Sequence, residues 1–130
     1  MANKNLKYQS PGINEETRFE KFHTVNFQSS KEASRLIARE ICDLVKSKQE
    51  INKSCVIGFA TGSSPSIVYQ EIIMIHKNES LSFKNVIAFN LDEYYGINKD
   101  DTNSYHHFMN ENLFDHIDIP KENINIPSGE

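Results

Sequence analysis

Two adjacent carboxylates, Asp92 and Glu93, follow an apolar run at residues 85–91. Successive side chains of a strand point to opposite faces, so only one of the two can face a given substrate. At the mouth of an apolar crevice a carboxylate loses solvation and takes up a proton more readily, which makes it a competent base for a carbon acid beside a carbonyl. The alternative is structural: Asp92 or Glu93 caps a turn or pairs with a cation.

A second candidate segment, Thr61, Gly62, Ser63 and Ser64 followed by a proline, comes directly after the apolar run 55–60. Its small side chains, hydroxyl groups and flexible glycine, together with the free N–H groups of a helix start, suit a phosphate. The segment lacks the lysine of a nucleotide-binding Walker loop, so we expect a phosphomonoester rather than a nucleoside triphosphate. The structural alternative is a serine-capped helix after a tight turn.

Other candidate residues give weaker signals. His106 and His107 are adjacent, so a helix points them about 100° apart and they cannot grip one ion together; a solvated helix face explains them better. The acidic residues at 92, 93, 100 and 101 have no spacing that demands a shared cation, and we assign no metal. Tyr94 and Tyr95 could stack on a sugar ring, although buried aromatics beneath a loop are the commoner arrangement.

These segments need elements to position them, and the chain alternates helix and strand patterns. Ser29 with Glu32 forms a capping box before an apolar helical stripe over about 30–48. The stripe consists of Ala33, Leu36, Ile37, Ile41, Leu44 and Val45. The runs 55–60 and 85–91 predict strands buried on both faces, and Pro65 after a Ser64 cap starts a helix between them that extends to about residue 77.

A strand, a helix and a second strand with short joints form a right-handed βαβ unit with parallel strands. The predicted class is α/β: a Rossmann-like parallel sheet with helices on both faces, as the N-terminal half of a full domain. Ligands of such sheets bind outside the carboxyl ends of the strands, so both candidate loops should face one crevice. We expect a further helix capped by one of residues 101–103, a strand near 124–126, a short strand at 22–27 and a flexible N-terminal arm at 1–18 before the domain at 19–130.

Composition excludes several classes of protein. The chain of 130 residues has material for one core. Its formal net charge of -4 repels a phosphate backbone, so we expect no nucleic-acid partner. Its apolar runs fall far below the roughly 20 residues needed to cross a bilayer, and its start does not look like a signal peptide, so we expect a cytoplasmic protein without a membrane partner. Cys42 and Cys55 should both be reduced.

The segments 61–65 and 89–94, the latter reading Phe-Asn-Leu-Asp-Glu-Tyr, resemble those of the glucosamine-6-phosphate deaminase family, whose members are also called glucosamine-6-phosphate isomerases. Segments 81–86, 103–105 and 116–125 resemble the same family in the same order, so the resemblance covers residues 29–129. It implies conversion of glucosamine 6-phosphate, a small amino-sugar phosphate, to fructose 6-phosphate and ammonia, in amino-sugar catabolism. It also implies that the reaction needs no redox cofactor or catalytic metal and that the full-length enzyme is a homo-oligomer.

The resemblance implies a role for each candidate residue. Thr61, Gly62, Ser63 and Ser64 would hold the sugar phosphate through backbone amides and hydroxyls, and Asp92 would be the base that moves a proton between C2 and C1 of the open-chain amino sugar. Many members carry glycine and threonine where this chain has the two serines; a serine can still donate to the phosphate, so we treat this difference as variation. Members also continue well beyond position 130 with further acid, base and basic residues, so we expect this chain alone to be inactive.

Three alternatives stay open. The 6-phosphogluconolactonases share the fold and a similar phosphate loop, but they typically have Gly-Asp-Glu-Arg where residues 91–94 read Leu-Asp-Glu-Tyr, which favours the deaminase. A second alternative is a sugar-phosphate-binding module that has lost turnover. A third is an inactive fragment.

Overall fold

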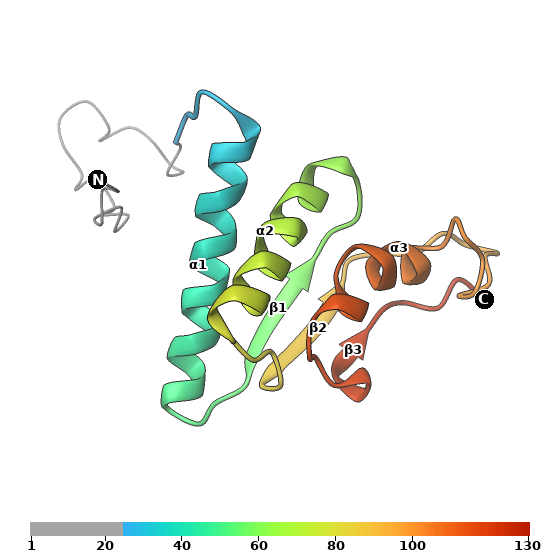
Figure 1. The fold of residues 1–130 in the computed structure, drawn as a ribbon. Helices are drawn as coiled ribbons and strands as arrows, with labels where there is room; N and C mark the ends of the chain where they lie inside the picture. Colours follow the sequence, from blue (N-terminus) through green and yellow to red (C-terminus); the bar gives the residue numbers. More distant parts are fainter. Residues whose placement is uncertain (1–24) are drawn as a thin grey trace, which may run out of the picture.

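The computed structural model describes residues 25–130, so the N-terminal arm predicted at 1–18 lies outside the described residues. Helices and strands alternate along this part of the chain (Figure 1). They are α1 (Ser30–Glu50), β1 (Cys55–Phe59), α2 (Ser63–Glu79), β2 (Val86–Asn90), α3 (Tyr105–Asn112) and β3 (Ile124–Asn125), with 3-10 helices at Phe114–His116 and Lys121–Asn123. Residues 25–27 are not in a strand, and the start of the strand predicted at 22–27 is not described.

The strands form a parallel sheet in the order β1-β2-β3. Cys55 lies opposite Val86 at one end of the β1–β2 pair, and Phe59 lies opposite Asn90 at the other. Helix α2 carries the chain back to the start of the sheet, which is the geometry that makes two successive strands parallel. The predicted α/β class and βαβ unit are therefore confirmed.

Helix α1 begins where the capping box predicted, because Ser29 Oγ accepts a hydrogen bond of 3.2 Å from the N–H of Glu32. Its buried side chains are Ser34, Ala38, Cys42 and Val45. The predicted apolar stripe is wrong in part, since Ile37 and Leu44 are 45% and 46% exposed. The mostly small residues Ser34, Ala38 and Cys42 form the covered face because they allow α1 to lie close against α2.

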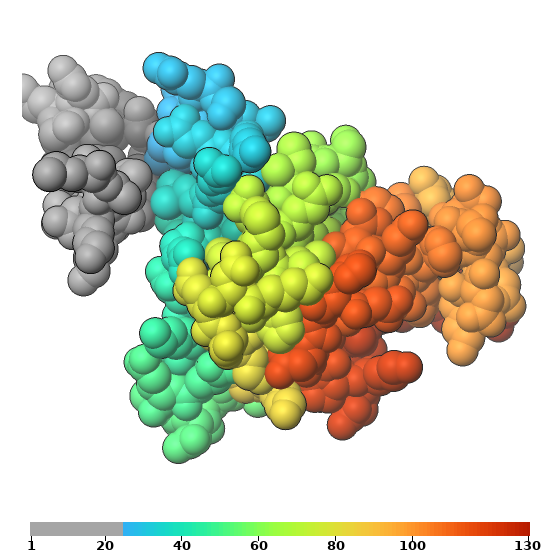
Figure 2. All heavy atoms as spheres, viewed as in Figure 1, coloured from blue at the N-terminus to red at the C-terminus, as the bar shows by residue number. Residues whose placement is uncertain are grey.

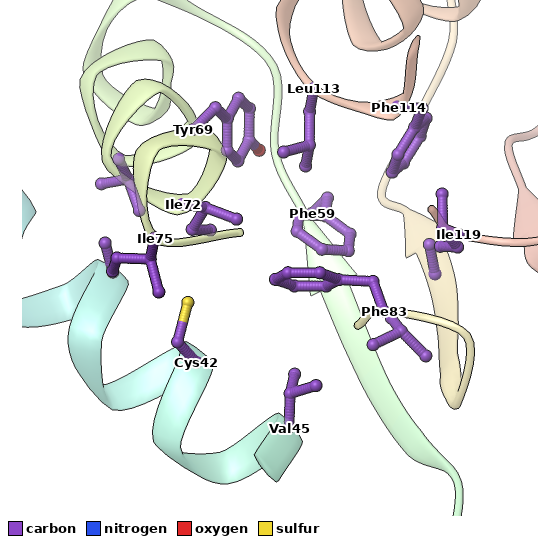
Figure 3. Close-up of a cluster of buried hydrophobic side chains, with 14 of the residues drawn as sticks. Cys42, Val45, Phe59, Tyr69, Ile72, Ile75, Phe83, Leu113, Phe114 and Ile119 are labelled. Carbon is purple, nitrogen blue, oxygen red and sulfur yellow. The ribbon is translucent and has the colours of Figure 1, made fainter. Parts of the chain in front are cut away.

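A single hydrophobic core joins the helices to one face of the sheet (Figure 3). The ring of Phe59 meets Tyr69 of α2 and Phe114 edge-on, at centroid distances of 5.9 Å and 5.7 Å. Side chains of α2 and of the segment from α3 onward meet over this face (Figure 2). Cys42 and Cys55 are free and buried, as expected, and burial raises the pKa of the Cys42 thiol to about 11, which leaves it unreactive at neutral pH.

In the described part of the chain, the opposite face of the sheet is bare. Val56 of β1 is 63% exposed and Phe89 of β2 is 48% exposed, although both belong to apolar strands. Helix α1 packs beside α2 rather than across the sheet from it, so the described helices cover a single face (Figure 1). Within residues 25–130, the prediction of strands buried between two helical layers is therefore met on one face only.

Candidate active site

Both loops that the sequence singled out leave the sheet at the same edge. Phe59 and Asn90 are the last residues of β1 and β2 and form the final pair of their register. Thr61 and Asp92 each follow two residues after these strand ends. Both loops therefore leave the sheet at the carboxyl ends of its parallel strands, as expected, and ligands of such sheets bind there.

The start of α2 depends on Gly62. This residue is the N-cap, with φ +122° and ψ 177°, a combination essentially restricted to glycine. Among residues 25–130 no side chain caps the helix, and Ser63 and Ser64 are exposed at its first turn. The predicted cap at Ser64 is wrong because the glycine lets the chain turn into the helix two residues earlier. The first N–H groups of α2 keep no side-chain partner, an arrangement that attracts an anion.

The two adjacent carboxylates lie in opposite environments, as strand alternation predicted. Asp92 is exposed, whereas the side chain of Glu93 is only 1% exposed. The Glu93 carboxylate accepts hydrogen bonds from the N–H groups of Tyr94 and Tyr105 at 2.9 Å each, and from that of His106 at 3.1 Å. Glu93 thus takes the capping role named as an alternative. The partly desolvated position expected for Asp92 is not formed by the described residues.

His106 completes the network around Glu93, because its Nδ1 lies 3.0 Å from Glu93 Oε2. Burial raises the pKa of the Glu93 carboxyl, but the hydrogen bonds from the Tyr105 N–H, the His106 ring and the N–H groups of Tyr94 and His106 together outweigh burial and hold that pKa below its usual value. The His106 side chain is 25% exposed, so its assignment to a solvated helix face is wrong. His107 fits that description better at 41%.

Asn90 is a candidate site residue that the motifs of the sequence did not single out. It is 8% exposed, and neither its Nδ2 nor its Oδ1 has a hydrogen-bond partner among the described residues. The signal was an amide at the end of an otherwise apolar strand, two residues before Asp92.

The paired tyrosines do not lie beneath the loop. Tyr94 is 55% exposed and its ring lies 4.7 Å from that of Tyr105, while Tyr95 is 98% exposed. The expectation of buried aromatics is therefore wrong, and both rings are accessible at the surface.

Across residues 25–130, no cluster of three or more histidine, cysteine, aspartate or glutamate side chains is suited to hold a metal ion. In the same range, no helix combines the length and apolar character needed to cross a bilayer.

Comparison with known proteins shows which family the chain belongs to. The model of the family described as glucosamine-6-phosphate isomerases/6-phosphogluconolactonase matches residues 28–129. The chain belongs to this family. A glucosamine-6-phosphate deaminase from Oceanobacillus iheyensis is 44% identical over 106 residues, which are 82% of this chain and 40% of that protein. The chain therefore spans less than half the length of this relative.

Solved structures of the isomerase/lactonase fold agree with the topology. A monomeric glucosamine-6-phosphate deaminase matches with a TM-score of 0.76 and 40% identity over 82% of this chain and 42% of that one. A devB protein matches with a TM-score of 0.67 at 19% identity, over 80% of this chain and 42% of that one, and so supports the fold alone. The recognised family and the Rossmann-like parallel sheet are both confirmed.

Proposed function

We propose that this chain provides the phosphate loop and the general base of a glucosamine-6-phosphate deaminase. Thr61, Gly62, Ser63 and Ser64 bind the phosphate of glucosamine 6-phosphate through the free N–H groups at the start of α2 and through hydroxyl groups. Asp92, which follows the carboxyl end of the neighbouring strand β2, acts on the sugar carbons. An anion is stabilised at this position by the positive end of the α2 dipole.

In the proposed reaction the sugar is in its open-chain form, with the aldehyde at C1 and the amine at C2. Asp92 removes the proton from C2, and the electron pair forms a C1–C2 double bond as the aldehyde oxygen gains a proton. Return of a proton to C1 leaves a carbon–nitrogen double bond at C2. Water adds there and ammonia leaves, which produces fructose 6-phosphate. A positioned carboxylate suits the two proton transfers between carbons.

One observation carries the proposal: the uncapped start of α2 and the exposed Asp92 both follow the carboxyl ends of paired parallel strands. The relatives of the chain at 41% to 47% identity are named glucosamine-6-phosphate deaminases. The test is calorimetric titration of the protein with glucosamine 6-phosphate and fructose 6-phosphate, beside an assay of ammonia release. Saturable binding of both sugars that is competed by inorganic phosphate supports the proposal. Binding of neither overturns it.

A second candidate, sugar-phosphate binding without turnover, is favoured by the exposure of Asp92, which retains the water that a strong base must lose. Binding without ammonia release in a full-length protein, built from this chain and the C-terminal part of the Oceanobacillus iheyensis relative, would support that candidate. Hydrolysis of a 6-phosphogluconolactone is not favoured, since the relatives named above are deaminases.

A further inference from the structure

The Asn90 side chain is an anomaly in the folded chain. It is 8% exposed, and both of its polar atoms lack a hydrogen-bond partner within residues 25–130. Buried polar groups are almost always paired, because an unpaired one loses its contacts with water and gains nothing in return. Leucine, of similar size, would therefore suit the folded state of this position better than asparagine.

Asn90 lies at the carboxyl end of the sheet, where the two candidate loops begin, rather than deep in the core. It ends β2, and its register partner Phe59 shows that its side chain lies on the helix-covered face. A cavity of about 420 Å³ adjoins it, lined by Asn90, Phe89, His106 and residues 124–127. Asn90 is thus two residues from Asp92 and lines this open space at the carboxyl ends of the strands, while its two amide atoms are enclosed and meet a ligand when the side chain turns toward the cavity.

We propose that the Asn90 amide binds the hydroxyl-bearing carbon chain of the sugar phosphate. The inference rests on the proposed function and adds a binding group to the same site. A primary amide offers donors at Nδ2 and an acceptor at Oδ1. Neighbouring hydroxyl or carbonyl oxygens of a sugar can meet both kinds of group at once. Inorganic phosphate offers mainly hydrogen-bond acceptors, and the Oδ1 acceptor of the amide would repel it. The amide therefore binds the carbon chain of the sugar in preference to the phosphate.

The first experiment needs no substitution. The side-chain amide resonance of Asn90 is followed by NMR in the 130-residue protein during titration with fructose 6-phosphate and, separately, with inorganic phosphate. We expect the sugar phosphate to shift the Asn90 resonance saturably and inorganic phosphate to leave it in place. A resonance that stays unmoved while fructose 6-phosphate binds overturns the inference.

The second experiment compares Asn90→Leu with Asn78→Leu, a control at an exposed position near the far end of α2. Asn90→Leu should raise the melting temperature and weaken binding of fructose 6-phosphate by about tenfold, the loss of two neutral hydrogen bonds. Its affinity for inorganic phosphate should stay within about twofold of the original. The control should change none of the three.

The outcomes separate the two proposals. Unchanged sugar-phosphate affinity in Asn90→Leu overturns the role of Asn90 and leaves the proposed function standing. Failure of the unaltered protein to bind fructose 6-phosphate overturns the proposed function, and the role of Asn90 with it. If Asn90→Leu does not fold, the NMR titration decides.

Discussion

At the scale of single residues, the neighbouring carboxylates Asp92 and Glu93 have different roles. The exposed Asp92 is free to meet a ligand, while Glu93 is enclosed and accepts hydrogen bonds from three backbone N–H groups. A group so fully engaged has no acceptor capacity to give a substrate. The proposed base is therefore Asp92.

Asp92→Asn should lower turnover by about 100-fold or more while leaving the affinity for fructose 6-phosphate nearly unchanged, because the amide keeps the shape and loses the base. The measurement is ammonia release by a full-length deaminase built from this chain and the remaining C-terminal part of the Oceanobacillus iheyensis relative. Asp100→Asn, at an exposed aspartate of the same connection, is the matched control and should retain full activity. Near-normal turnover in Asp92→Asn would contradict the assignment.

At the scale of elements, the starts of two helices shape the site by different means. The start of α3 is capped by the Ser104 hydroxyl and by the buried Glu93 carboxylate from the preceding loop, whereas α2 begins on a glycine and has no side-chain cap among the described residues. The first arrangement fixes the loop after β2 against α3. The second leaves backbone N–H groups available to a ligand.

Glu93→Gln should destabilise the fold by about 2 kcal/mol at neutral pH, because an amide NH₂ replaces an oxygen that accepts hydrogen bonds to a buried charge. The folded-state pKa of Glu93 is lowered, so its contribution to stability is fully present above 4.5, the ordinary value, and is lost as the pH falls through the folded-state pKa. Urea unfolding should therefore show a difference between the two proteins that shrinks on acidification. Glu111→Gln, at a side chain 72% exposed, is the control. A difference that does not depend on pH would argue against the charge of Glu93 as the cause.

Gly62→Val should weaken binding of fructose 6-phosphate and destabilise the fold by about 1–3 kcal/mol, because a β-branched residue cannot readily adopt the backbone conformation at this helix start. A β-carbon at this position would meet no atom of a non-adjacent residue within 4 Å, so the expected effect comes from the φ of +122°. Gly58→Val is the matched control: it lies on the bare face of β1 with open space around it. Calorimetric titration and thermal melting of both variants check the prediction. Unchanged affinity in Gly62→Val would remove this loop from the proposed site.

At the scale of the whole molecule, the uncovered sheet face is the feature that we expect to control self-association. Val56 and Phe89 expose apolar surface on a face that parallel sheets normally bury. Exposed apolar patches of this kind promote association. The described residues also hold no evident acid placed to open the sugar ring beside Asp92.

We expect the 130-residue protein to self-associate and to release no measurable ammonia. Light scattering and the ammonia assay test the two parts separately. The double variant Val56→Thr, Phe89→Thr should reduce self-association, since threonine keeps strand propensity while lowering apolar exposure. Tyr95→Thr removes an aromatic side chain that is 98% exposed but lies outside the sheet, and should leave association unchanged. A monomer with a sharp unfolding transition and substantial turnover would refute the prediction.

The sequence by itself determined the order of helices and strands from residue 30 onward, the parallel βαβ unit and the position of both candidate loops, because apolar runs and capping residues such as Ser29 act locally. Only the tertiary structure decided which face of α1 is buried, since Ile37 and Leu44 match the helical period yet face away from α2. It also decided that Glu93 caps α3, through partners twelve and thirteen residues along the chain, and that the Asn90 amide is buried without a partner among residues 25–130. Such features depend on what packs across the space between elements, and a local pattern does not contain that information.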